Sequence, residues 1–221
     1  MKSLRILQGM VLLCILLVPV LIFLFLKGFG SNSYDLPVFF EKGVDSPFQE
    51  CASDTTQHYI PDFAFTNQEG KTVGRSDMEG YVTIVDFFFT SCPSICPIMS
   101  DEMERVNDMF RDHPEVRIMS ISIDPEYDTP EILQEYAAKH HAKAGKWDFL
   151  TGDKLETYRL ARCGFVIPTI DGMGVPDDFV HSDKFVLVDR KGRIRGYYSG
   201  TDREAVDLLM LEAKVLLHAD E

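Results

Sequence analysis

The feature that most constrains this chain is a short corner, with two cysteines in it, between an apolar strand and a helix. Residues 82–89 are almost wholly apolar, and the corner after them reads Thr90-Ser91-Cys92-Pro93-Ser94-Ile95-Cys96-Pro97. Beyond Pro97, apolar residues recur every three or four positions, which predicts a helix. The spacing therefore predicts that both sulfur atoms lie in a tight turn at the start of a helix.

Two prolines set the geometry of this corner. Proline has a fixed φ and no N–H, so Pro97 suits the first position of a helix. The residue before a proline avoids the helical region, so we expect Cys96 to cap the helix. A helix N-terminus favours anions and lowers the pKa of a thiol, and the thiolate binds metals and attacks disulfides. The alternative, two inert core cysteines, fits poorly with two prolines at a strand-to-helix corner. The corner indicates a redox site or a soft-metal site without choosing between them.

The N-terminus predicts a membrane anchor. Lys2 and Arg5 precede an uncharged, mostly apolar run over residues 6–26, which Lys27 ends. About 20 apolar residues span a bilayer, whereas a cleaved signal peptide has a shorter core and a small-residue cleavage site. The flanking positive charges predict a cytoplasmic N-terminus. We expect an uncleaved single-pass helix in a bacterial inner (cytoplasmic) membrane, with the rest of the chain facing the periplasm or the cell exterior.

The 221 residues suit one anchor and one domain of ordinary size. We expect the anchor at residues 1–30, a linker and lead-in at 31–57, and the domain at 58–221. The formal net charge of −13 argues against nucleic acid as a partner, because binding of nucleic acid requires a basic surface.

Strands and helices alternate along the predicted domain, which indicates an α/β fold. Strands are expected at 61–66, 82–89, 116–123, 147–150, 184–189 and 194–198, and helices from Pro97, from Pro130, around 155–160 and at 202–217. A cysteine corner after an early central strand, with a hairpin before the last helix, is the thioredoxin arrangement. The predicted fold class is therefore a thioredoxin-like mixed sheet flanked by helices, with an N-terminal transmembrane helix.

His181 is the third candidate site residue. It lies in the loop before the strand at 184–189, and in thioredoxin-type folds this loop arrives beside the cysteine corner. Thiolates select Cu(I) or zinc, and imidazole suits copper and zinc. A closed zinc site requires a fourth protein ligand, and none is obvious in the sequence. Cys92, Cys96 and His181 together therefore favour one copper ion, as Cu(I) or Cu(II).

These residues resemble the Sco/SenC family. The resemblance is carried by residues 90–97, by the run Ser122-Ile123-Asp124-Pro125-Glu126-Tyr127-Asp128-Thr129, by His181 before an apolar strand and by the single anchor. It covers the chain from about Pro61 to the last helix. The resemblance implies copper bound by Cys92, Cys96 and His181. It also implies a role at the binuclear copper centre of cytochrome c oxidase subunit II, either copper delivery or reduction of that subunit's cysteines.

The sequence departs from the family beside the histidine. Many members carry Asp directly before it, and here that residue is Val180. Asp177, Asp178 and Asp183 are the nearby carboxylates that could orient the imidazole. We expect Met99 to be a core residue rather than a fourth ligand. The remaining histidines are expected at the surface: His58, His113, His140, His141 and His218.

Three further cysteines are not part of the predicted site. Cys14 falls within the apolar run, and the bulky Leu13 before it makes it a poor lipidation site. Cys51 and Cys163 could form a disulfide in an oxidising compartment, or they could remain two separate thiols. The sequence leaves this choice open.

Three functions remain compatible with the sequence. The first is a metallochaperone that passes copper to cytochrome c oxidase subunit II or another copper-accepting protein. The second is an enzyme, a thiol–disulfide reductase in which Cys92 and Cys96 are catalytic. The third is a redox or copper sensor. His181 separates the first two, because a copper site needs this ligand and a reductase does not.

Overall fold

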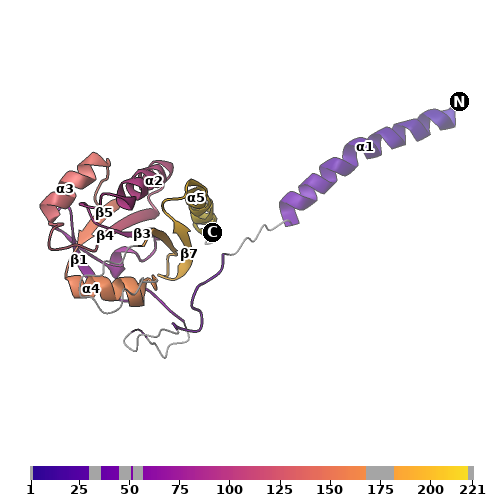
Figure 1. Cartoon of the computed structure of the whole chain (residues 1–221). Coiled ribbons are helices and arrows are strands. Elements are labelled where there is room, and N and C mark those ends of the chain that lie inside the picture. Colours follow the sequence, from indigo (N-terminus) through magenta and orange to yellow (C-terminus); the bar gives the residue numbers. More distant parts are fainter. Residues whose placement is uncertain (1, 30–35, 45–50, 52–56, 168–181, 219–221) are drawn as a thin grey trace. The chain divides into compact units, whose positions relative to one another are not determined.

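The computed structural model describes residues 2–29, 36–44, 51, 57–167 and 182–218, which belong to two compact units, Met1–Asp35 and Leu36–Glu221. The first unit holds helix α1 (Lys2–Phe29), shown in indigo and violet in Figure 1. Its segment Gln8–Phe25 has a mean hydropathy of 2.7, and none of these residues is buried. By length and composition, α1 is suited to cross a membrane, as expected for the predicted anchor.

The second unit is an α/β domain. Its elements, in chain order through the described residues, are β1 (Ala64–Asn67), β2 (Thr72–Gly74), the 3₁₀ turn η2 (Arg75–Asp77), β3 (Val82–Phe88), α2 (Ile95–Met109), β4 (Val116–Ser122), α3 (Pro130–Lys139), β5 (Trp147–Thr151), α4 (Lys154–Arg159), the π-helical turn η3 (Leu160–Gly164), β6 (Lys184–Val188), β7 (Ile194–Ser199) and α5 (Arg203–His218).

One mixed sheet carries these strands in the order β2-β1-β5-β4-β3-β6-β7. The centre is parallel, with β4 between β3 and β5. Both sides of this centre are antiparallel, since β1 pairs with β5 and β6 pairs with β3. β3 is therefore a central strand, and its carboxyl end delivers the cysteine corner to one edge of the sheet.

Helices cover both faces of the sheet, which explains why β3 reads as a nearly continuous apolar run. Ile84 and Phe88 face a core shared with α2, α3 and α5, whereas Val85 and Phe87 face a second core with η3. Figure 1 shows α2, α3 and α5 on one side of the sheet and α4 on the other. A strand buried on both faces needs apolar residues at every position. The predicted mixed sheet flanked by helices is confirmed.

The predicted start of α2 is wrong by two residues. The helix begins at Ile95 with Ser94 as its N-cap, so Cys96 is the second helical residue and Pro97 the third. The first-turn N–H groups of a helix have no partner within the helix, so proline is tolerated there beyond the first position. The consequence is that Cys96 is built into the first turn of α2, while Cys92 remains in the preceding loop.

The segment before β1 is attached to the domain. The guanidinium of Arg195 donates hydrogen bonds to the backbone carbonyls of Leu36 and Pro37, and the Phe39 N–H donates to the Ile194 carbonyl at 2.9 Å. A disulfide joins Cys51 to Cys163 in η3. Of the two alternatives left open by the sequence, the structure therefore contains the disulfide.

Two of the histidines expected at the surface are buried. His58 is 7% exposed, and its Nε2 lies 2.7 Å from the Gly164 carbonyl. Burial lowers the pKa of His58, although the carbonyl opposes this. His140 is 3% exposed, and its Nδ1 lies 2.6 Å from Oε1 of Glu104. Both residues join separate segments of the domain, and local sequence does not reveal such long-range partners.

Candidate metal centre

The cysteine corner is a tight turn that is largely closed to solvent. After β3 ends at Phe88, the Cys92 N–H donates to the Phe89 carbonyl at 3.3 Å. The side chains of Cys92 and Cys96 are only 6% and 4% exposed, and both thiols are free. The two predicted cysteines are thus held close together along the chain, Cys92 in the loop and Cys96 in the first turn of α2.

Asp128 holds the start of this corner in place. Its carboxylate accepts hydrogen bonds from the Thr90 N–H at 3.1 Å, from the Thr90 hydroxyl and from the Ser122 hydroxyl at 2.5 Å. Asp128 is fully buried, so these bonds form away from competing water. The carboxylate therefore ties the ends of β3 and β4 together two residues before Cys92.

The two thiols have very different acidities. Burial tends to raise the pKa of Cys92, but the N–H groups of Cys96 and Ser94, together with the Cys96 and Ser94 side chains, lower it to about 7. The Ser94 hydroxyl lies 3.7 Å from the Cys92 sulfur. Burial raises the pKa of Cys96 to about 12, and Cys92 and Asp86 add to this effect. Near neutral pH the pair therefore holds a reactive thiolate at Cys92 and a protonated thiol at Cys96.

Asp86 is a buried acid on the same face of β3 as the cysteines. It lies between Ile84 and Phe88 at a spacing of two residues, so all three side chains share the face that contacts the core with both sulfurs. Burial raises its pKa to about 7, although the Ser120 hydroxyl, which donates to it at 2.6 Å, opposes the shift. Ser120 in turn accepts a hydrogen bond from the Trp147 indole at 2.9 Å. Sequence reasoning missed Asp86, although an acid inside an otherwise apolar strand was a visible signal.

Met99 lies in the buried core of the domain, in the cluster that also contains Cys92 and Cys96. Its side chain is 1% exposed and packs within the core cluster, as expected from helical spacing. A second group with ligand chemistry comprises Asp101, Glu104 and His140, whose candidate ligand atoms lie within 4.8 Å of one another. There the Nδ1 of His140 lies 2.6 Å from Oε1 of Glu104, and its Nε2 is buried with no hydrogen-bond partner.

His181 lies outside the described residues, and so do Asp177, Asp178 and Val180. The chain is described again from Ser182, which is buried and accepts a hydrogen bond from the Lys184 N–H. The carboxylate of Asp183 accepts bonds from Ser199 and Lys184. Of the three carboxylates considered as partners for the imidazole, the described one is thus already engaged at the start of β6.

The fold and the corner together define a class of protein. It is a thioredoxin-like domain that carries, at the carboxyl end of a central strand, two free thiols with very different pKa values. Residues 52–213 match the model of the SCO1/SenC family, and this chain belongs to that family. The predicted family membership is thereby confirmed.

Individual relatives are similar over most of their length. The SCO1 protein homolog of Bacillus subtilis is 32% identical over 165 residues, which is 73% of this chain and 84% of that protein. A solved structure of BsSco, a Sco-family cytochrome c oxidase assembly protein in which a disulfide switch was identified, has a TM-score of 0.61 and 32% identity over 71% of this chain and 92% of that one. ScoI of Bradyrhizobium japonicum, solved with copper bound, has a TM-score of 0.54 and 27% identity over 72% and 99% of the two chains.

Proposed function

We propose that this chain is a membrane-anchored copper metallochaperone that holds one copper ion on Cys92, Cys96 and His181 and delivers it during cytochrome c oxidase assembly. The recipient would be the binuclear copper centre of subunit II. The observation that carries the proposal is the pair of free, nearly buried thiols at the corner, one of them with a pKa of about 7.

The donor set fits copper as cargo. Thiolates are soft ligands that suit Cu(I), and an added imidazole suits either oxidation state. Binding copper would displace the proton from Cys96, because metals bind thiolate rather than thiol. Release would proceed by ligand exchange, in which cysteines of the recipient replace Cys92 and Cys96 one at a time without a change in copper oxidation state.

The connection of His181 to β6 supports its place in this set. β6 runs antiparallel to β3, with Val186 opposite Val85, so the amino end of β6 lies beside the carboxyl end of β3, where the cysteine corner begins. His181 precedes Lys184 by three residues, which span at most about 11 Å. The proposal therefore requires that the sulfur pair lie within reach of this short length of chain.

The relatives support both parts of the proposal. ScoI of Bradyrhizobium japonicum was solved with copper bound, and BsSco belongs to a family of cytochrome c oxidase assembly proteins. Residues 52–213, which match the family model, include the cysteine corner and position 181. The copper and the assembly role are extended to this chain from those proteins.

Copper titration of the reduced full chain in detergent tests the proposal. We expect one copper per chain, with absorption bands from thiolate-to-copper charge transfer when Cu(II) is bound. Cys92→Ser, Cys96→Ser and His181→Ala should each abolish tight binding, whereas the matched control His113→Ala, at an exposed histidine, should retain it. Full stoichiometry and unchanged bands in His181→Ala would refute the assignment of that ligand.

A thiol–disulfide reductase is the second candidate, and the acidity of the thiols favours it specifically. The Cys92 thiolate would attack a disulfide of the recipient, giving a mixed disulfide, and Cys96 would then close a Cys92–Cys96 disulfide and release the reduced recipient. Two electrons pass from this chain to the recipient. A disulfide-containing peptide from an oxidase copper site, reduced equally well by His181→Ala and by the unaltered chain, would favour this role.

We also propose the topology of the chain: residues 1–30 anchor it in a bacterial inner membrane, residues 31–57 lead in, and residues 58–221 face the periplasm or cell exterior. The apolar helix α1 and the Cys51–Cys163 disulfide, which suits an oxidising compartment, support this arrangement. Protease added to spheroplasts should digest the domain, and protection of the domain in intact spheroplasts would reverse the orientation.

A further inference from the structure

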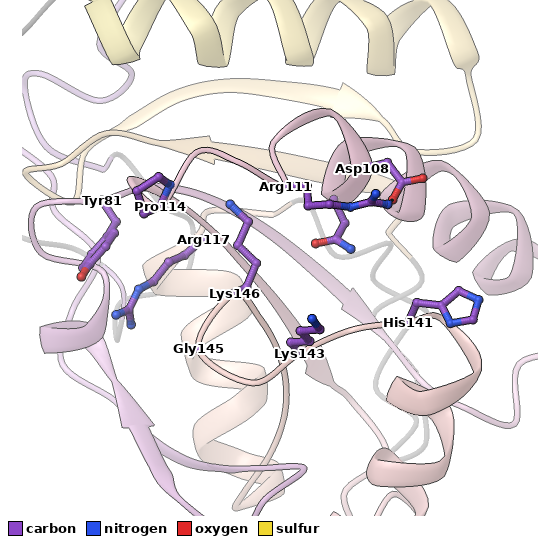
Figure 2. A pocket seen from close by; sticks show the side chains of 10 residues that line it. Tyr81, Asp108, Arg111, Pro114, Arg117, His141, Lys143, Gly145 and Lys146 are labelled. Atoms are coloured by element: carbon purple, nitrogen blue, oxygen red, sulfur yellow. The ribbon is translucent and has the colours of Figure 1, made fainter.

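A basic pocket lies at the end of the sheet opposite the cysteines. It has a volume of about 460 Å³ and is lined by Tyr81, Asn107, Asp108, Arg111, Pro114, Arg117, His141, Lys143, Gly145 and Lys146. The residues labelled in Figure 2 come from the turns before β3, β4 and β5, from the end of α2 (Asp108) and from the start of β4 (Arg117). The cysteine corner leaves the carboxyl end of β3, so the pocket belongs to a different edge of the domain.

The charge of the pocket is opposite to that of the protein. Its lining includes four Lys and Arg residues but one acid, Asp108. The whole chain has 22 Lys and Arg residues against 35 Asp and Glu residues. Like charges that share a pocket repel one another, so such a local excess of positive charge is stabilised when an anion is present.

Two of the four cations are held by the protein itself. The Lys146 ammonium donates to the carbonyls of His113 and Val116 at 2.7 and 2.8 Å, and burial lowers its pKa although Glu115 opposes this. Arg111 pairs with Asp108 one turn earlier on α2 at 2.5 Å, but both side chains are exposed. An exposed pair of this kind is weak, so Arg111 remains available to another anion.

The other two cations are less committed. The Arg117 guanidinium stacks on the Tyr81 ring at 3.9 Å, its nearest carboxylate oxygen is on Asp77 at 3.7 Å, and its Nε is buried with no hydrogen-bond partner. Lys143 is exposed, and its ammonium forms no hydrogen bond or ion pair within the described part of the chain. The pocket therefore offers an anion three groups: the oriented guanidinium of Arg117, the unengaged ammonium of Lys143, and the guanidinium of Arg111, which can leave Asp108.

The negative ends of helices α2 and α3 do not account for this arrangement. Cations at helix C-termini are favourable, and Arg111 lies just beyond α2. Lys143, however, lies four residues beyond the end of α3 at Lys139, and Arg117 lies within β4. A helix dipole acts only near the last turn, so at least these two cations require another explanation.

We propose that this pocket binds a small phosphate-bearing anion. Guanidinium and ammonium groups together are the usual donors to phosphate oxygens, and a volume of about 460 Å³ falls within the range of small-molecule sites and exceeds the needs of one inorganic phosphate. The phosphate could belong to a free phosphorylated molecule or to the headgroup of a phospholipid in the membrane that holds α1. The site is independent of the copper proposal, because it shares no residue with the cysteine corner.

Lysine footprinting of the full chain in nonionic detergent, with pyrophosphate as the probe, tests the pocket. Lys143 and Lys191 are both exposed, and Lys191 lies in the β6–β7 turn outside the pocket. Pyrophosphate should slow acylation of Lys143 by about tenfold at low salt while Lys191 reacts at an unchanged rate. Arg111→Gln should raise the dissociation constant for pyrophosphate by about tenfold, and Lys191→Gln should change it by no more than about twofold.

Reconstitution of the chain in nanodiscs distinguishes the two sources of phosphate. Protection of Lys143 in discs with phosphatidylglycerol but not phosphatidylcholine, without added pyrophosphate, would identify the lipid headgroup. Protection only on addition of pyrophosphate would identify a soluble ligand. The proposal is overturned if Lys143 is unprotected in both arms, or if Lys143 and Lys191 are protected equally, since equal protection indicates general charge screening.

Discussion

The carboxylate of Asp128 accepts two hydrogen bonds from Thr90, one from its backbone N–H and one from its hydroxyl. Asp128 lies just before α3, and Thr90 lies two residues before Cys92, so the loop after β4 positions the loop that carries the site. The same carboxylate also accepts the Ser122 hydroxyl. These hydrogen bonds join the two runs of residues that carry the resemblance to the Sco/SenC family, residues 90–97 and residues 122–129.

Replacing Asp128 should destabilise the domain. Asp128→Ala leaves the Thr90 N–H, the Thr90 hydroxyl and the Ser122 hydroxyl without their buried acceptor, and we expect a loss of about 3 kcal/mol in the free energy of unfolding. Asp128→Asn keeps one acceptor oxygen and should cost about 1 kcal/mol. Urea unfolding measures both. Asp112→Ala, at an exposed acid, is the control, and equal stability of the two alanine variants would contradict the role of Asp128.

The acidity of Cys92 predicts the pH dependence of its alkylation. Because its pKa is about 7, thiolate accumulates above pH 7, and the rate with iodoacetamide should rise with a midpoint near pH 7. Cys96, with a pKa of about 12, should stay unmodified through pH 9. Mass spectrometry of the copper-free reduced chain reads out each cysteine separately.

Ser94 offers a matched test of what lowers the pKa of Cys92. Ser94→Ala removes the hydroxyl that lies 3.7 Å from the Cys92 sulfur, so the midpoint should move upward, whereas Ser91→Ala at an exposed serine should not move it. The backbone N–H groups remain in both variants and should keep the Cys92 midpoint below 9.0, the ordinary value. Equal alkylation of Cys92 and Cys96 at every pH would contradict the asymmetry.

The sequence predicted the parts of the fold that depend on local patterns. The apolar run of β3 and the capping residue Thr129 before Pro130 gave nearly correct boundaries, because burial on both faces and helix capping are local signals. The start of α2 was placed too late because Pro97 is acceptable at the third helical position as well as the first.

Residues that act through distant partners could not be found in this way. Asp86 acquires its shifted pKa from the packing of β3 against β4 and α2, and Asp128 acts through Thr90, 38 residues away. Cys51 and Cys163 are 112 residues apart, and their pairing depends on where the lead-in segment meets η3. The position of His181 relative to the sulfur pair remains a prediction.

The Cys51–Cys163 disulfide should contribute strongly to stability. It closes a loop over a sequence separation of 112 residues, and loop-closure entropy predicts a contribution of about 5 kcal/mol. Cys51→Ser with Cys163→Ser should therefore lower the urea midpoint substantially while leaving the Cys92 alkylation profile unchanged. Single Cys51→Ser should match the double variant. Two free thiols at these positions in the unreduced chain, detected by alkylation and mass spectrometry, would rule the bond out.

Asp86 should make the domain less stable as the pH rises from 4 toward 7. Its folded pKa is about 7 because it is buried, whereas an ordinary Asp has a value of 3.8, so the folded state retains a proton that the unfolded state releases. This contribution is fully present below about pH 4 and is lost as the pH approaches 7, with a limit of about 4 kcal/mol. Urea unfolding from pH 4 to 6.5 measures the slope below the titration of Cys92.

Asp86→Asn removes this titration, so the free energy of unfolding of the variant should vary less between pH 4 and 6.5. As the pH rises, the variant should therefore become more stable relative to the unaltered chain. The Asn carbonyl can still accept the Ser120 hydroxyl, which limits the structural change. Asp62→Asn, at an exposed acid, should preserve the original slope. If Asp86→Asn and the unaltered chain have parallel pH profiles, the buried carboxyl is not the source of the dependence.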